Sequence, residues 1–339
     1  MDRNTPDFMA FFDAAMRPGS DARGFYHRNV RVTVGPDSFM VRVPMEESEV
    51  MDLSIWAEHD ILSVLHPHLT HAPRLLHVHH DPYFQVQEFI EGERVEDLHP
   101  YGASIPARII DDIVVLFSEL LSFPESRIPA LPADWPADGD SEGFGAVLLR
   151  LGRSLREDHG KEAPRLFETL GIPEDPFLPL EDGLKDLTSR PFRLLHGDIH
   201  RGNLIRGAQE TFFLDWQLAL WGDPVYDLAD HVHKMGYTPD SEQRCIRGWL
   251  SVAPGECRRR WSEDLKFYLA YERVKSSVVD TVRWARRIAQ APTGSPARHT
   301  AVQELTAKIN RARPYWSQGD SGVLAADRVA SAVTEFHQA

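Results

Sequence analysis

Hydrophobic and polar residues alternate with a period of two through much of the first 90 positions, which predicts β-strands. Asn29 to Val34 and Phe39 to Val43 form one pair of strands around the turn Gly35-Pro36-Asp37-Ser38. Leu75 to His79 and Phe84 to Glu88 form a second pair. The front of the chain is therefore expected to fold into a small sheet.

Two helices are predicted beside these strands. The first begins after Thr5-Pro6-Asp7, and the second runs from about Glu49 to His66 and stops before Pro67. The second helix has an inward stripe at steps of three and four residues that is apolar except for one carboxylate. The stripe consists of Met51, Ile55, Glu58, Leu62 and Leu65.

Beyond Gly92 the pattern becomes mainly helical, interrupted by a loop rich in Pro, Asp and Gly over 124–143. Apolar spacing predicts helices near 109–123, 144–158, 226–236, 241–251, 262–288, 298–312 and 323–337. A strand-rich front and a helix-rich remainder indicate an α+β protein of two lobes with a cleft between them. We place the small N-terminal lobe at 1–92, with a hinge at 88–92, and the larger helical lobe at 93–339.

Composition narrows the class of protein further. The 339 residues carry a net charge of −14, which argues against binding to nucleic acid or to an anionic membrane and suits cationic ligands. No stretch reaches the roughly 18 apolar residues of a membrane span, and the N-terminus lacks a signal-peptide pattern. The two cysteines, Cys245 and Cys257, form no familiar zinc or redox motif. We therefore expect a cytoplasmic protein.

The strongest chemical signal is the segment His196-Gly197-Asp198-Ile199-His200-Arg201-Gly202-Asn203, which follows two leucines. Asn203 lies five positions after Asp198, and Asp215 ends an apolar run soon afterwards. Phosphoryl transfer from a nucleotide needs one carboxylate at the attacking hydroxyl, and an amide oxygen and a second carboxylate on magnesium. The catalytic loop of protein kinases has the same spacing between its Asp and its Asn. His196 is expected to orient the loop through hydrogen bonds.

The spacing also has a geometric logic. Leu204 to Arg206 and Thr211 to Leu214 are predicted to form a short hairpin centred near position 209. That centre pairs Asn203 with Asp215, since each lies six residues from it. The two side chains would then emerge side by side, where one cation can bridge them.

At these residues the chain resembles the aminoglycoside phosphotransferase family, a branch of the protein-kinase-like fold. The resemblance extends to Gly222-Asp223-Pro224-Val225-Tyr226-Asp227 and becomes weak after about position 235. It implies a two-lobed small-molecule kinase that uses ATP and Mg²⁺. Asp198 would be the catalytic carboxylate, and Asn203 and Asp215 would be the magnesium ligands.

A buried carboxylate needs a partner, and Arg42 on the strand Phe39 to Val43 is the expected partner of Glu58. In kinase folds a basic residue on that strand contacts the nucleotide phosphates and pairs with a glutamate of the helix. The segment Gly24 to Asn29 occupies the place of a phosphate-covering turn, although a plain loop fits its single glycine equally well. Glu88 and Ile90 belong to the segment that, by resemblance, holds the adenine edge through its backbone.

Candidate substrate-binding residues are acidic, because the resembled family recognises its substrates largely through acidic loops and the helical lobe. They are Asp223, Asp140, Glu142, Glu272 and Asp280. Each one is also compatible with an ordinary surface carboxylate.

The sequence thus predicts an ATP-dependent O-phosphotransferase acting on a hydroxyl of a small molecule, without nucleic acid or membrane partners. The resemblance favours an antibiotic as acceptor, either an aminoglycoside or another sugar-bearing or nucleoside antibiotic, for resistance or self-protection. A metabolic kinase of sugars, choline or homoserine fits the same motifs. A catalytically silent nucleotide-binding protein is disfavoured by the intact set of Asp198, Asn203 and Asp215. The pattern does not specify the oligomeric state.

Overall fold

The computed structural model describes residues 8–17, 22–23, 27–45, 54–316 and 322–338. The chain forms two compact units. The first comprises Met1–Ala133, Arg193–Pro224 and Lys234–Pro254, and the second comprises Asp134–Phe192, Val225–His233 and Gly255–Ala339. These units do not follow the expected division at residue 92, which stays a prediction.

The first unit contains an antiparallel five-stranded sheet in the order β1-β2-β3-β5-β4. Both predicted strand pairs are confirmed within it. The strands are β1 (Ala22–Arg23), β2 (His27–Val34), β3 (Asp37–Pro44), β4 (Leu75–His80) and β5 (Tyr83–Glu88).

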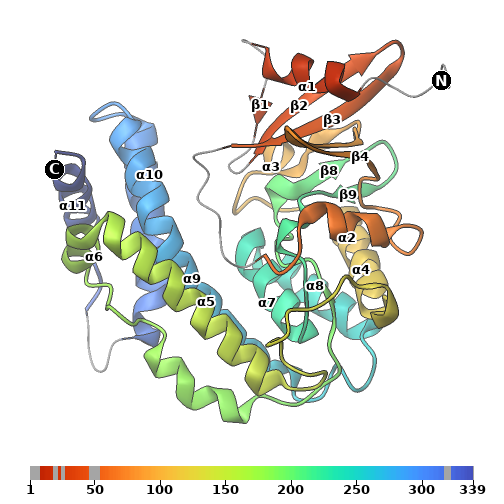
Figure 1. Cartoon of the computed structure of the whole chain (residues 1–339). Coiled ribbons are helices and arrows are strands. Elements are labelled where there is room, and N and C mark those ends of the chain that lie inside the picture. Colours follow the sequence, from red (N-terminus) through yellow and green to blue (C-terminus); the bar gives the residue numbers. More distant parts are fainter. Residues whose placement is uncertain (1–7, 18–21, 24–26, 46–53, 317–321, 339) are drawn as a thin grey trace. The chain divides into compact units, whose positions relative to one another are not determined.

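The two faces of this sheet differ in chemistry because side chains alternate along each strand. Phe84 and Val86 of β5 join an apolar cluster with Val41 and with Phe11 of helix α1 (Phe8–Met16), which lies against β2 and β3 (Figure 1). On the other face, Gln85 lies opposite Arg42 of β3. The sheet therefore has one face that forms a core and one that presents polar groups.

Helix α2 (Glu58–Leu65) is shorter than the predicted helix from Glu49 to His66. Residues 46–53 lie outside the described part of the chain, and residues 54–57 are not helical. Ser54 donates to the Gln217 carbonyl and the Trp56 indole to the Ala130 carbonyl, which fixes this segment outside the helix. Glu58 and Asp60 then lie in the first turn, where the helix dipole favours carboxylates.

Two small sheets complete the strands of the first unit. One has the order β6-β8-β9, and the other pairs β7 with β10. Their bounds are β6 (Glu93–Arg94), β7 (Arg193–Leu195), β8 (Leu204–Arg206), β9 (Thr211–Phe213) and β10 (Leu220–Gly222). Besides α1 and α2, the α-helices that lie wholly in this unit are α3 (Val95–Leu98), α4 (Ala107–Ser122) and α8 (Pro239–Val252).

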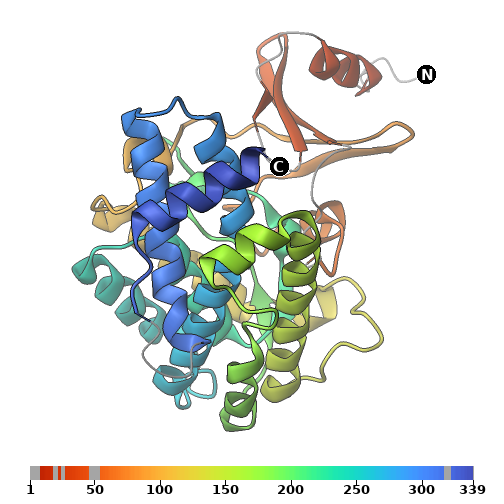
Figure 2. The same cartoon turned by 90° about the vertical axis from the view of Figure 1, so that its left-hand side faces the viewer.

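The second unit is helical (Figure 2), and its long helix α9 packs against both α5 and α10. Its helices are α5 (Ser141–Glu162), α6 (Pro164–Leu170), α9 (Trp261–Gln290), α10 (Pro296–Ala312) and α11 (Ala326–Gln338). Helix α7 (Pro224–Met235) contributes its ends to the first unit and its middle to the second. Of these helices, only α6 lacked a prediction. Among the described residues, no helix has the length and hydropathy needed to cross a membrane.

Candidate active site

The predicted catalytic loop connects β7 to β8. Leu194 and Leu195 of β7 are buried and carry the chain to Gly197, whose φ of 72° lies in the left-handed region. A Cβ atom at this position would collide with the Leu218 carbonyl oxygen. Glycine is required here both for its backbone conformation and for this close approach.

Three side chains contact the carboxylate of Asp198. The Lys234 ammonium donates to Oδ1 at 2.7 Å, the Asn203 amide donates to Oδ2 at 2.9 Å, and His200 Nε2 lies 3.6 Å from Oδ2. Burial favours the neutral acid, but the Lys234 and His200 charges outweigh burial and hold the pKa of Asp198 well below its usual range. Asp198 is therefore a carboxylate at neutral pH.

Lys234 and His200 were not predicted as site residues. Lys234 lies 36 positions after Asp198, and only the fold brings the two together. Two features of the sequence could have drawn attention to Lys234. Lysine is rare in this chain, which has 6 lysines and 31 arginines, and Lys234 lies on the helix that begins at the Gly222-Asp223-Pro224 motif. Asp198 and His200 stabilise each other's charged form. Burial acts to lower the pKa of His200, but the Asp198 carboxylate raises it.

Arg201 anchors the loop from its buried side. It is 3% exposed, and its guanidinium donates to five backbone carbonyls. Each bond satisfies both a buried donor and a carbonyl that would otherwise need another partner. The five carbonyls belong to His99, Pro100, Ala103, Met235 and Gly236.

His196 orients the loop, as predicted. It is fully buried, its ring centroid lies 4.4 Å from that of Trp216, and its Nδ1 accepts a hydrogen bond from the Asp198 backbone N–H. Burial lowers the pKa of His196 to about 4, so the ring is neutral at physiological pH.

The predicted hairpin is present, but its predicted register was wrong by one residue. Leu204 pairs with Phe213, and the Leu214 N–H donates to the Asn203 carbonyl at 2.8 Å, so Asn203 lies opposite Leu214. The hairpin loop has four residues, closed by a bond from the Gly207 N–H to the Glu210 carbonyl. Because the loop has an even number of residues, the centre of the hairpin lies between two residues. Asp215 therefore lies one position beyond the pair of Asn203 and Leu214.

Asp215 lies at a left-handed backbone position, with φ 66° and ψ 71°. A non-glycine residue there costs on the order of 1 kcal/mol and persists where the surroundings hold it. Arg42 holds the Asp215 side chain at 3.0 Å, and the N–H of the next residue, Trp216, donates to Glu58 Oε1 at 3.2 Å. The backbone turn thus directs the Asp215 carboxylate to Arg42.

Arg42 joins two carboxylates from different elements. Its Nε lies 3.1 Å from Glu58 Oε2, which confirms the predicted pairing. Arg42 and Glu58 are 6% and 5% exposed. Burial is the largest influence on Glu58 and raises its pKa to about 6 against the opposing effect of Arg42. His27 Nδ1 lies 3.5 Å from Arg42, and burial together with the Arg42 charge lowers the pKa of His27 to about 4.

The predicted nucleotide hinge is only partly available for ligands. The backbone N–H of Glu88 donates to the Arg74 carbonyl, and its carboxylate pairs with Arg74 at 3.1 Å. Ile90, on the half-buried segment that follows β5, is the better candidate for a backbone contact with a base. Gly24 to Tyr26 of the predicted phosphate turn lie outside the described residues.

Three of the five predicted substrate-binding carboxylates have structural partners. Asp140 caps α5 by accepting from the Gly143 N–H, Glu272 is fully buried and pairs with Lys275 at 2.6 Å, and Asp280 pairs with Lys308 at 2.7 Å. Glu142 is exposed on α5, and Asp223 is fully buried in the first unit. These surroundings give Asp140, Glu272 and Asp280 structural partners within the second unit.

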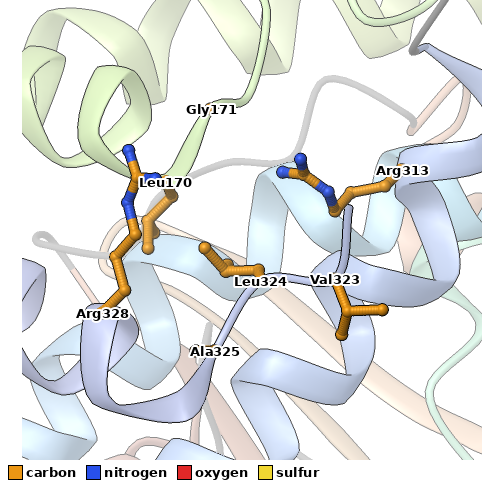
Figure 3. Close-up of a pocket in the computed structure, with 7 residues that line it drawn as sticks. All are labelled: Leu170, Gly171, Arg313, Val323, Leu324, Ala325 and Arg328. Carbon is orange, nitrogen blue, oxygen red and sulfur yellow. The ribbon is translucent and has the colours of Figure 1, made fainter. Parts of the chain in front are cut away.

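The second unit contains a cavity of about 390 Å³ (Figure 3). Its two arginines have structural partners, since Arg328 donates to the Thr169 carbonyl and Arg313 to the Gly322 carbonyl. None of the predicted site residues lines it. The lining residues are Leu170, Gly171, Arg313, Val323, Leu324, Ala325 and Arg328.

The donor set near Asp198 is suited to magnesium. Asn203 directs its amide nitrogen to Asp198, so its Oδ1 is the atom for a cation, and the Asp215 carboxylate is 26% exposed. Within the described ranges no group of three or more His, Cys, Asp or Glu residues is arranged to hold a metal ion. Mg²⁺ needs no such cage, because it binds through one or two protein oxygens together with water and substrate phosphates.

The fold is kinase-like. Three similar solved structures are a choline kinase, LicA, from Streptococcus pneumoniae, an ethanolamine kinase from Plasmodium vivax, and a complex of gentamicin with APH(2")-IIa. Their sequence identities to this chain are 15%, 14% and 15%, with TM-scores of 0.57, 0.57 and 0.53. The alignments cover 89%, 88% and 91% of this chain and 97%, 85% and 99% of the other chains. The predicted α+β kinase-like fold is confirmed by this likeness.

No curated protein sequence matches the chain. A family model does match, that of the phosphotransferase enzyme family (APH), over residues 20–261. Kinases of this family use ATP with Mg²⁺, in agreement with the predicted enzyme class and cofactors. The matched region contains the Asp198 loop, the β8–β9 hairpin and the Arg42–Glu58 pair, and the chain belongs to the phosphotransferase enzyme family.

Proposed function

We propose that this enzyme transfers the γ-phosphoryl group of ATP to a hydroxyl group of a small molecule. The observation that carries the proposal is the Asp198 carboxylate, held ionised and oriented by Lys234 and Asn203. In this reaction the acceptor oxygen bonds to the γ-phosphorus, the bond to the β-phosphate oxygen breaks, and the hydroxyl proton passes to Asp198. A low pKa suits a carboxylate that positions the hydroxyl and takes the proton late.

The remaining predicted residues have complementary roles in the proposal. Arg42, kept in place by Glu58, contacts the nucleotide phosphates. Asn203 and Asp215 are the residues that hold Mg²⁺, which when bound neutralises phosphate charge. Ile90 contacts the base through its backbone. All of these residues belong to the first unit.

The acceptor we favour is an antibiotic with sugar or nucleoside hydroxyls, so that phosphorylation gives resistance or self-protection. The similar structure containing gentamicin supports this class, and the similar choline and ethanolamine kinases support the alternative of a metabolic kinase. Use of ATP fits the predicted cytoplasmic location.

The test is an incubation with ATP, Mg²⁺ and a panel of alcohols: aminoglycosides, nucleoside antibiotics, neutral sugars, choline and homoserine. We expect one class to gain a phosphoryl group, detected by mass spectrometry and ³¹P NMR. D198N is the matched control, which should bind ATP with the wild-type Kd and form product about 10²-fold more slowly or not at all. ATP hydrolysis without any phosphorylated acceptor would contradict the proposal.

A further inference from the structure

The charge next to the catalytic carboxylate is positive. Lys234 lies near the C-terminal end of α7, and its ammonium contacts both Asp198 Oδ1 at 2.7 Å and the Gly197 carbonyl at 3.0 Å. It is the only lysine in the first unit. On the other carboxylate oxygen, His200 lies at 3.6 Å. The single negative charge of Asp198 is therefore already matched by Lys234.

These groups remain open to solvent on one side. The side chains of Asp198, Lys234 and His200 are 16%, 21% and 36% exposed. A hydroxyl that hydrogen-bonds to Asp198 must approach through this exposed part. The atoms attached next to that hydroxyl then lie close to the ammonium and the imidazole.

The sign of this local charge discriminates between acceptors. A second ammonium beside Lys234 brings like charges together in a partly desolvated place, and such juxtapositions are strongly unfavourable. Hydroxyl, carbonyl and carboxylate oxygens, in contrast, are attracted to the ammonium. The favourable substituent next to the target hydroxyl is therefore neutral or anionic.

We infer that Lys234 determines acceptor specificity, selecting alcohols with an oxygen substituent next to the phosphorylated hydroxyl and rejecting those with an ammonium group there. The inference rests on the proposed phosphotransfer to a small-molecule hydroxyl. It gives the acceptor class as neutral sugars, nucleosides or hydroxy acids. The cationic acceptor expected from the net charge of −14 is disfavoured at this position.

The experiment compares acceptors that differ only in one substituent. Glucose is paired with glucosamine, and ethylene glycol with ethanolamine, at a pH where each amine is protonated and Glu58 is ionised. Wild-type kcat/KM should be higher for the neutral member of each pair that is phosphorylated. In K234M the ratio of neutral to cationic kcat/KM should fall by about tenfold or more, because the repelling charge is gone.

Two controls separate specificity from structure. R244M removes one positive charge from an exposed pair with Asp111 in the same unit and should leave the ratio unchanged. K234R keeps the charge and should retain the preference for the neutral acceptor, which also guards against misfolding of K234M. If Lys234 only supports Asp198, K234M will lower kcat for both members equally and the ratio will stay the same.

The outcomes distinguish the inference from the function beneath it. Phosphorylation with a wild-type preference for the cationic member, or an unchanged ratio in K234M, overturns the role of Lys234 and leaves the proposed function intact. Failure to phosphorylate any alcohol, with ATP still bound, overturns the proposed function and the inference together.

Discussion

At the scale of single residues, the site consists of groups whose charge is set by their neighbours. Asp198 is charged because the effect of Lys234 and His200 on its pKa exceeds the effect of burial. His196 is neutral because burial has the largest effect on its pKa. The Asp198 loop could be recognised in the sequence, since the spacing between Asp198 and Asn203 is local. The contact with Lys234 was not, because it depends on where α7 ends.

The first prediction concerns Asp198. D198N keeps the size of the side chain and removes the charge that orients the hydroxyl and accepts its proton. We expect kcat to fall by about 10²-fold or more, the usual contribution of a positioned base, with little change in the Kd for ATP. Steady-state kinetics and calorimetry measure the two quantities. A variant with near wild-type turnover would rule out Asp198 as the catalytic carboxylate.

The second prediction concerns pH and the buried pair. Burial raises the pKa of Glu58 to about 6. Its carboxylate is therefore charged above that pH and becomes protonated as the pH falls through 6. The KM for ATP should therefore rise below pH 6 in the wild type, since Arg42 loses a partner. His27 stays neutral across this range, its pKa being about 4.

E58Q is the control for that titration. It should have a raised KM for ATP at pH 7.5 and no further change near pH 6 beyond that of the nucleotide itself. Coincident pH profiles for E58Q and the wild type would mean that another group titrates.

At the scale of elements, the hairpin and helix α2 show which features local sequence predicts. The strands β8 and β9 were evident from alternation, but their register depended on whether the loop had an odd or an even number of residues. Helix α2 begins at Glu58 because tertiary bonds from Ser54 and Trp56 hold the preceding segment outside it. The pairing of Arg42 with Glu58 was predictable because one carboxylate interrupted an apolar stripe.

The third prediction belongs to the β8–β9 hairpin. D215N removes the carboxylate charge from the residue that follows the hairpin and leaves an amide oxygen. The Mg²⁺ concentration for half-maximal activity should rise on the order of tenfold or more, because even indirect supports of a metal site have effects of that size. N203A should act in the same direction. A Mg²⁺ titration of both variants checks this, and unchanged curves for both would remove these residues from the metal site.

At the scale of the whole molecule, the net charge of −14 does not describe the surroundings of Asp198. The acidic residues expected to attract a cation have other roles, since Asp140 caps a helix and Glu272 and Asp280 pair with lysines. Gly143 and Lys275 lie only three residues from Asp140 and Glu272, whereas Lys308 lies on a different helix from Asp280. Composition alone does not show which side chains meet, so it could not reveal these contacts. Family membership was predictable because its motifs are contiguous or nearly so.

The fourth prediction uses salt to weigh these two views. Surface charges are screened over about 8 Å at physiological ionic strength. If the local charge at Asp198 governs selection, the preferred acceptor is not a cation, and its KM should not rise steeply between low and high salt, while kcat should stay constant. A steep rise in KM with salt would instead favour attraction of a cationic acceptor by the overall negative charge.

Arg201 has a consequence for how such an enzyme can diversify. Its five bonds secure the catalytic loop from the buried side, independently of the two charged groups on the exposed side. If Lys234 selects the acceptor as inferred, changes at Lys234 or His200 would alter which molecules are accepted while the bonds of Arg201 keep the proposed catalytic loop in place. A library randomised at these two positions should be rich in folded variants, of which those that keep Asp198 ionised can have new acceptor ranges, whereas one randomised at Arg201 should consist mostly of misfolded protein.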